Sequence, residues 1–330
     1  MRRLFLLLLL VAAALAGAGA WWVNAPLPLA GGAAVELEVE PGATPLGVAQ
    51  AAAAAGVQVP PRLLRLWFRV SGKDRQIKAG NYEIPVGTTP LLLLRKLVRG
   101  DATMLTVALI EGWNFRQVRA ALAHADGLKH ETQDMSDEAL MAALGRPGVA
   151  PEGRFFPDTY AYAKGSSDLA VLRRALRQMD RRLEAAWAAR ASDLPLKSPD
   201  EALTLASLVE KETGRPQDRA LIAGVFVNRL RAGMLLQTDP SVIYGLGEKF
   251  DGNLRKRDLQ ADTPYNTYTR AGLPPTPIAM PGRAALLAAV QPEPTKALYF
   301  VARGDGSSEF SATLGEHNRA VNRYQRGGGK

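Results

Sequence analysis

The chain has 330 residues, 47% of them hydrophobic and 22% charged, which is enough to bury the cores of two or three domains. It contains no cysteine, and its three histidines (His124, His130 and His317) lie far apart, so we expect neither a metal nor another cofactor. The net charge of +9 comes from scattered Lys and Arg, which argues weakly for anionic surroundings such as phospholipid headgroups or an acidic polymer, and on charge alone nucleic acid also fits.

The first predicted element is an apolar helix at the amino terminus. After the charged start MRR, the run LFLLLLLVAAALAGAGAWWV extends uncharged from Leu4 to Val23, about the 20 residues of a membrane span. The leading arginines orient this helix with its start in the cytoplasm. The sequence therefore predicts a single-pass anchor over residues 1–24 in a bacterial inner membrane, with the remaining chain in the periplasm. The small residues of AGAGA leave a cleaved signal peptide as the alternative, and either reading excludes nucleic acid as a partner.

Three segments then repeat one pattern, a β-rich stretch followed by a turn and a helical stretch. They read VELEVEPGATPLGVAQAAAAAG, GNYEIPVGTTPLLLLRKLVRG and LTVALIEGWNFRQVRAAL. Thr44, Thr89 and Asn114 stand where a side chain would cap the following helix, and Pro follows the two threonines at the first helical position. The pattern predicts a small α/β domain over residues 35–123. It resembles LysM-like carbohydrate-binding modules, with a plain α/β scaffold as the alternative.

The segment EGRFFPDTYAY, Glu152 to Tyr162, carries four aromatic rings around a Pro-Asp turn. Aromatic rings of this kind either stack on sugars or fill a hydrophobic contact inside the protein. We favour the hydrophobic contact.

The next strong signal is the helix that contains LASLVEKETG, Leu205 to Gly214. Ser198 and the following Pro-Asp-Glu predict its start, and apolar residues at helical spacing predict one buried face. Glu210 lies beside that face, whereas Glu212 is rotated from it by about 200°. We therefore expect Glu210 to project into the fold, and Glu212 to be exposed or to support it.

A carboxyl beside apolar surface has its charged form disfavoured, so its pKa rises and it can hold a proton near neutral pH. Such a group can protonate the leaving oxygen of a glycosidic bond, and peptidoglycan is the obvious polymer for an exported enzyme. The alternative for Glu210 is a salt bridge or a helix cap.

Three motifs in order, LASLVEKETG, VFVNRLRAGMLLQTDPSVIYGLG and YNTYTRAGLPPTPIAMPG, closely resemble the YceG-like (MltG) family of membrane-anchored endolytic murein transglycosylases. The resemblance continues to YFVARGDG and HNRAVNRY and departs at LIEGW, where we expect a Pro before Glu-Gly. It implies an α+β fold whose lysozyme-like catalytic domain occupies residues 124–330. It also implies cleavage of nascent peptidoglycan strands with 1,6-anhydro-muramyl ends, beside glycan polymerases (penicillin-binding proteins) at the inner membrane.

The resemblance places the single catalytic acid on Glu210 and matches Glu212 to the second Glu of the EKE run. Further polar and aromatic side chains are expected to bind the glycan: Asn228, Gln237, Thr238, Asp239, Tyr244, Asn266, Thr267 and Tyr268. Turn formation is the alternative for Asp239 and for the Asn266-Thr267 pair. For Asn228 the alternatives are a hydrogen bond to Glu210 and a helix C-terminal cap.

Two other functions remain open from the residues. One is a noncatalytic peptidoglycan-binding module. The other is a lysozyme-type hydrolase, which requires a second carboxylate, for which Asp239 and Asp262 are the candidates.

Overall fold

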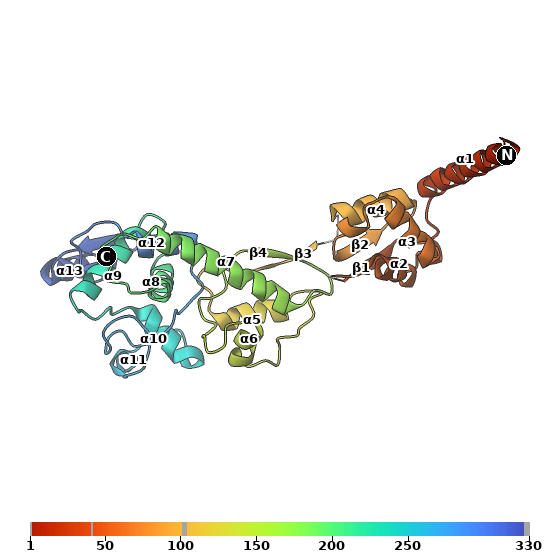
Figure 1. Ribbon diagram of the computed structural model, residues 1–330. Helices are drawn as coiled ribbons and strands as arrows, with labels where there is room; N and C mark the ends of the chain where they lie inside the picture. Colours follow the sequence, from red (N-terminus) through yellow and green to blue (C-terminus); the bar gives the residue numbers. More distant parts are fainter. Residues whose placement is uncertain (1, 41, 101–103, 327–330) are drawn as a thin grey trace. The chain divides into compact units, whose positions relative to one another are not determined.

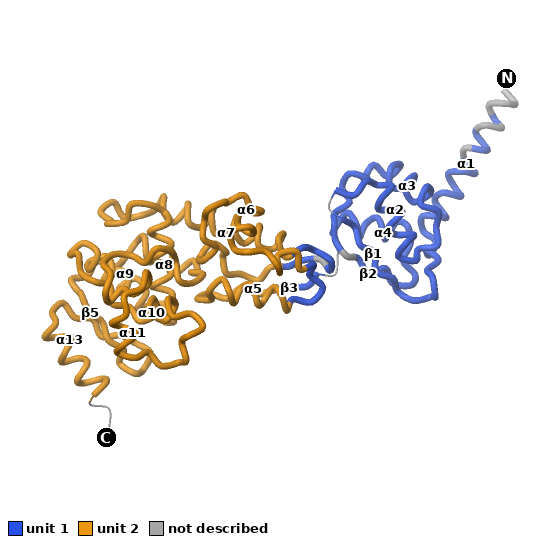
Figure 2. Tube along the Cα trace, turned by 90° about the horizontal axis from the view of Figure 1, so that it is seen from below, with its two compact units in different colours: residues 1–106, 125–129, 161–167 blue, residues 107–124, 130–160, 168–330 orange. Residues whose placement is uncertain are grey.

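A computed structural model describes residues 2–40, 42–100 and 104–326; the side chains of residues 2–5, 7, 8, 12, 81 and 163 also lie outside the description. The chain forms two compact units, shown in separate colours in Figure 2. Unit 1 consists of Met1–Thr106, Ala125–Lys129 and Ala161–Ser167, and unit 2 of Val107–His124, His130–Tyr160 and Asp168–Lys330. The chain contains both helices and antiparallel strands, so the predicted α+β class is confirmed.

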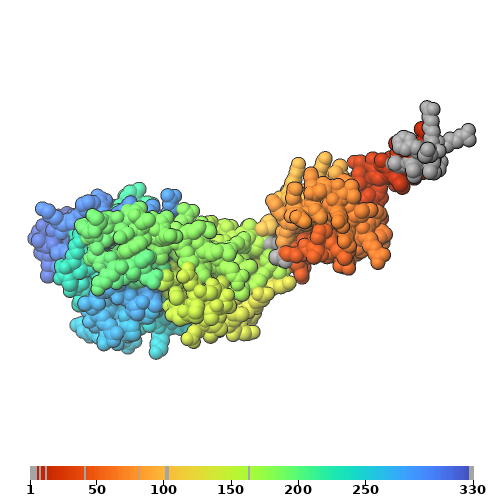
Figure 3. All heavy atoms as spheres, viewed as in Figure 1, coloured from red at the N-terminus to blue at the C-terminus, as the bar shows by residue number. Residues whose placement is uncertain are grey.

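Unit 1 is built on a two-stranded antiparallel sheet of β1 (Val35–Val39) and β2 (Gly80–Ile84) (Figure 1). Leu37 lies opposite Tyr82, and both are fully buried because alternate side chains of a strand point to one face. The helices of this unit are α1 (Arg2–Asn24), α2 (Pro45–Ala54), α3 (Pro61–Val70) and α4 (Pro90–Arg99), with short 3₁₀ turns at η1 (Ala30–Gly32) and η2 (Asp74–Gln76). In the space-filling view, the atoms of this unit, coloured red to orange, form a packed surface (Figure 3).

The predicted helix starts of the repeats are confirmed. Thr44 accepts a hydrogen bond from the Gly47 amide at 3.1 Å, and Thr89 accepts one from the Leu92 amide at 3.2 Å. The pattern missed α3, which lies between the first two repeats and places their strands antiparallel. The third repeat forms β3 (Met104–Ala108) and α5 (Phe115–Ala123), and α5 belongs to unit 2.

The predicted membrane anchor is contradicted. The apolar run does form helix α1, but among the described residues no helix is both long and apolar enough to cross a membrane. The prediction rested on the absence of charged residues from Leu4 to Val23. The inner-membrane location, which rested on the anchor, is contradicted with it.

Unit 2 contains most of the helices, and α7 runs along its visible face in Figure 1. Its α-helices after α5 are α6 (Asp137–Ala143), α7 (Asp168–Ala188), α8 (Pro199–Glu212), α9 (Arg219–Arg231), α10 (Asp239–Leu246), α11 (Lys256–Gln260), α12 (Arg283–Val290) and α13 (Leu314–Val321). Shorter helical turns are η3 (Gly247–Lys249) and η4 (Asn322–Arg326). Two small sheets pair β3 with β4 (Thr159–Ala163), and β5 (Tyr299–Ala302) with β6 (Ser308–Ser311).

Helix α8 is the centre of the core of unit 2. Ser198 caps its first turn by accepting the Glu201 amide at 3.2 Å, as the sequence predicts. Every residue from Ala202 to Val209 is buried, so the helix is enclosed on all sides and not on one face alone. A helix that is apolar all round is typical of the interior of a large domain. The two glutamates of its last turn, Glu210 and Glu212, are therefore at least partly buried, whereas Lys211 between them is exposed.

The aromatic segment after Pro151 is also part of the interior. Phe155, Phe156, Tyr160 and Tyr162 are all buried, and the Phe155 ring stacks on Phe115 at 5.2 Å between ring centroids. Their rings are therefore unavailable for stacking on a sugar, and the hydrophobic interpretation holds.

Gly153 marks a close approach of two loops in this region. Its φ is +77°, and a Cβ at this position would lie 2.5 Å from the Cβ of Pro277. Only a residue without a side chain satisfies both the left-handed backbone and the contact.

Candidate active site

Glu210 lies in the last turn of α8 with only 5% of its side chain exposed. One carboxylate oxygen accepts the Gly282 amide at 2.8 Å, and the other lies 3.3 Å from a guanidinium nitrogen of Arg219. Burial raises the pKa of Glu210, although the Gly282 bond and the charge of Arg219 both lower it. The predicted desolvated carboxyl is present, and it also forms the salt bridge that was the alternative.

A second carboxylate, that of Glu111, lies close to Glu210. A Cβ at Gly282 would be 1.8 Å from a Glu111 carboxylate oxygen, so this carboxylate rests directly against Gly282. Its negative charge contributes to the raised pKa of Glu210. Asp262, by contrast, is exposed and paired with Arg270 at 2.7 Å.

Glu212 is half-buried, so the expectation of an exposed side chain is not met, whereas the expectation of a supporting role stays a prediction. It accepts a hydrogen bond from the Thr238 hydroxyl, and burial raises its pKa to about 7. The rotation of about 200° is sound geometry. Because α8 is enclosed, however, that rotation points Glu212 at the start of α10 and not at water.

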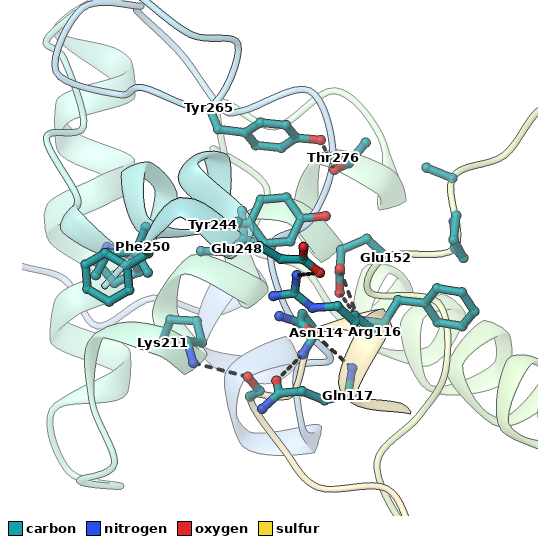
Figure 4. Close-up of a pocket in the computed structure, with 18 of the residues that line it drawn as sticks. Asn114, Arg116, Gln117, Glu152, Lys211, Tyr244, Glu248, Phe250, Tyr265 and Thr276 are labelled. Atoms are coloured by element: carbon teal, nitrogen blue, oxygen red, sulfur yellow. Dashed lines mark hydrogen bonds and ion pairs between the residues drawn. The ribbon is translucent and has the colours of Figure 1, made fainter. Parts of the chain in front are cut away.

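A cavity of about 1000 Å³ opens beside this end of α8 (Figure 4). Lys211 from α8 and Gly112 from the turn before α5 both line it, and the Lys211 ammonium donates to the Gly112 carbonyl at 3.2 Å. Glu210 is not among the described residues of the cavity wall. It lies immediately behind Gly112, where an added Cβ would be 4.0 Å from the Glu210 Cγ.

The cavity wall itself contains a buried carboxyl, Glu152. Both of its oxygens lie 3.1 Å from the Phe115 amide at the start of α5, and burial raises its pKa to about 7. Tyr244 lies beside it and packs edge-on against Tyr265 at 4.8 Å between ring centroids. The cavity thus combines aromatic rings with hydrogen-bonding groups, the composition of a sugar-binding site.

These carboxyls predict a pH dependence of stability. Both Glu152 and Glu212 have a pKa of about 7 in the folded protein against an ordinary value of 4.5, so the folded state binds more protons between these pH values. The free energy of unfolding should therefore be greatest below about pH 4.5, as far as these groups contribute, and should fall as the pH rises to about 7.

Urea unfolding at several pH values measures this decline. Glu212→Gln should reduce it without abolishing it, because Glu152 still contributes. If the free energy of unfolding of Glu212→Gln declined with pH as steeply as that of the unmodified protein, Glu212 would ionise as easily in the folded protein as in the unfolded chain.

Only some of the predicted glycan-binding residues reach the cavity. Tyr244 lines it, while Gln237 is exposed on the turn before α10, with φ +51°. Asp239 is exposed and accepts the Tyr268 hydroxyl at 2.5 Å. Their contacts with substrate stay predictions.

Three other predicted residues are engaged inside the protein. Asn266 is fully buried and donates to the carbonyls of the 258–261 turn, at 2.6 Å for that of Ala261. Thr267 accepts the Thr238 amide at 3.0 Å, which ties the YNTY loop to the start of α10. Asn228 donates to the carbonyls of Thr295 and Ala297 at 2.8 and 3.0 Å, so neither its predicted bond to Glu210 nor a side-chain cap is formed.

Sequence reasoning missed four residues of this site: Glu111, Glu152, Arg219 and Gly282. Glu111, Glu152 and Gly282 are far in sequence from the residues they contact, such as the 72 positions between Gly282 and Glu210, and Arg219 lies on the next helix, nine positions after Glu210. The Glu-Gly pairs of LIEGW and EGRFF were visible, but charge before glycine is also an ordinary turn pattern.

Comparison with known proteins gives a consistent result. A model of the YceG-like family matches residues 37–323. An endolytic murein transglycosylase of Bacillus subtilis is 33% identical over 267 residues, covering 75% of this chain and 73% of the relative. One from Streptococcus pneumoniae is 28% identical over 281 residues, and the alignment covers 74% of this chain but only 50% of that relative. The crystal structure of a YceG-like protein from Listeria monocytogenes superposes with a TM-score of 0.55 at 28% identity, covering 87% of this chain and 98% of that one.

Proposed function

Since this chain belongs to the YceG-like family, we infer that it is an endolytic murein transglycosylase, a lyase that cuts peptidoglycan strands. The observation that best supports this inference is Glu210, a desolvated carboxyl with a raised pKa beside a cavity of about 1000 Å³. A carboxyl that keeps its proton near neutral pH can act as a general acid.

We propose that Glu210 works alone in the bond cleavage between N-acetylmuramic acid and N-acetylglucosamine. Its proton passes to the glycosidic oxygen as the bond to the muramyl anomeric carbon breaks. The muramyl 6-hydroxyl oxygen bonds to that carbon, and the Glu210 carboxylate takes up the hydroxyl proton. The products are a free 4-hydroxyl and a 1,6-anhydro-muramyl end, and Glu210 is restored without the participation of water.

Arg219 and Gly282 fit this role because they favour the carboxylate that forms midway. A charged guanidinium at 3.3 Å and an amide at 2.8 Å stabilise the anion, while burial favours the acid. The two opposing influences keep both protonation states accessible.

A lysozyme-type hydrolase is the second candidate, and the proximity of Glu111 to Glu210 favours it. Hydrolysis through two carboxyls would leave a reducing end, since water and not the 6-hydroxyl completes the reaction. We expect instead that purified glycan strands yield anhydro ends, with products lighter by one water, as resolved by chromatography and mass spectrometry. Reducing ends would establish the hydrolase, and intact strands would leave a peptidoglycan-binding module.

We propose further that the sheet and helices of unit 1 between Val35 and Arg99 form a LysM-like module that holds the strand, ahead of a catalytic domain within residues 124–330. Its support is the predicted strand–turn–helix pattern and its compact core. The family resemblance supports nascent strands as the substrate, a cut that ends their elongation, and glycan polymerases as the partners that supply them.

A further inference from the structure

Glu152 makes a well-enclosed helix-capping contact. Its residue exposure is 6%, and both carboxylate oxygens accept the Phe115 amide. Phe115 is the first residue of α5, where backbone amides lack partners within the helix and negative charge is favoured. The Asn114 side chain accepts the Gln117 amide at 3.0 Å, so the first turn of α5 has two side-chain acceptors, Asn114 and Glu152.

The turn held by Glu152 is joined to the segment that contacts Glu210. The Gly112 amide donates to the Met280 carbonyl at 2.9 Å, and the Met280 amide donates back to the Trp113 carbonyl at 2.7 Å. Two residues later, the Gly282 amide donates to Glu210 at 2.8 Å. Moving the turn would therefore move the donor that lowers the pKa of Glu210.

We propose that Glu152 is a positioning residue for the cleavage reaction, acting through the Phe115 turn and the Met280 pair to hold the Gly282 amide against Glu210. The proposal rests on the function inferred above. It gives a positioning role to Glu152, which takes no part in the proton transfers of the reaction. It concerns geometry within unit 2 only, because all of these residues belong to that unit.

Different polar and charged groups surround Glu152 and Glu210. Glu152 is faced by the α5 amide, by Asp137 of α6 and by Tyr244 of α10. Glu210 is faced by Arg219 of α9, by Glu111 and by the Gly282 amide. Neither set includes the other carboxyl, so a change at Glu152 reaches Glu210 through the backbone contacts and not through direct charge.

A matched control exists at Asp168. This carboxyl is equally buried, and both of its oxygens lie 3.2 Å from the Thr132 amide, but its contacts are with the Thr132 loop and its own helix. Asp168→Ala and Glu152→Ala therefore both remove a buried backbone-capping carboxylate. A purely structural role predicts a similar outcome for the two variants.

The test compares the pH dependence of kcat on purified glycan strands. A general acid is active when protonated, so kcat falls as the pH rises through its pKa. Weakening the Gly282 bond removes an interaction that lowers the pKa of Glu210, so Glu152→Ala should shift this fall to higher pH and lower the plateau by about 10-fold or more. Asp168→Ala should lose stability without the shift. Glu152→Gln, which keeps an acceptor oxygen, should show a smaller shift and covers the case in which the Ala variant does not fold.

A second readout separates this proposal from the inferred function. Titration of the Glu210 carboxyl by ¹³C NMR, assigned with Glu210→Gln, should give a higher pKa in the Glu152 variants whether or not strands are cut. An unshifted Glu210 pKa would overturn the positioning role. Loss of cleavage in Glu152→Gln as complete as in Glu210→Gln would also overturn it, because Glu152 would then be the acid itself.

Discussion

Replacing Glu210 with Gln is expected to lower cleavage of purified glycan strands by about 100-fold or more, the usual scale for loss of a general acid. The amide keeps the size of the side chain and an oxygen for the Gly282 amide, but it has no proton to give. Because burial already penalises the charged form of Glu210, the neutral amide should leave the folded protein intact by circular dichroism. Glycan end-group analysis measures the loss.

Glu212→Gln is the control for that experiment. It removes a half-buried carboxyl that lies two residues away and contacts Thr238 from the opposite side of α8. We expect it to retain most activity. If Glu212→Gln abolished cleavage and Glu210→Gln did not, the catalytic acid would be Glu212.

Gly153→Ala is expected to destabilise unit 2 by about 3 kcal/mol, because it combines backbone strain with overpacking. The φ of +77° disfavours any side chain, and the new Cβ would lie 2.5 Å from the rigid ring of Pro277, which cannot rotate away. For a unit of this size the expected fall in Tm is about 10 °C. Calorimetry or thermal circular dichroism measures it.

Gly148→Ala isolates the backbone contribution to that loss. Gly148 has the same φ of +77°, but an added Cβ would meet no described atom within 4 Å. It should cost about 1 kcal/mol, from strain alone. Equal losses for the two variants would show that the Pro277 contact relaxes without cost.

Local signals in the sequence were sufficient for the helix starts. The cap at Ser198 and those at Thr44 and Thr89 depend on contacts within three residues, so the pattern contains the whole interaction. The capping box of Asn114 and Gln117 follows the same rule. The apolar spacing that predicted α8 was also sufficient to place Glu210 inside the protein.

The errors at the site have a common cause, which is that burial depends on elements distant in sequence. Helix periodicity orients Glu212, but only the packing of other segments around α8 decides that this direction is also interior. Asn228 looked like a residue of the Glu210 site, whereas its amide is held by a loop 67 and 69 positions away. Composition alone assigns no partner to an amide or a carboxyl.

The expected anchor fails for a different reason. It rested on the length of an uncharged run, and among the described residues no helix is both long and apolar enough to cross a membrane. For the EGRFFPDTYAY segment, sugar stacking was the alternative to the favoured hydrophobic contact, and the burial of its rings removes that alternative.

Complete enclosure of α8 also determines how the molecule opens. Segments surrounded by packed side chains exchange their amide hydrogens only when the whole unit unfolds, whereas loops with few buried contacts open locally at much lower cost. Glu210 is attached to the first kind of segment, and exposed cavity residues such as Glu248 belong to the second. Loop movements that let a long polymer enter the cavity can therefore occur while Glu210 stays in place on α8.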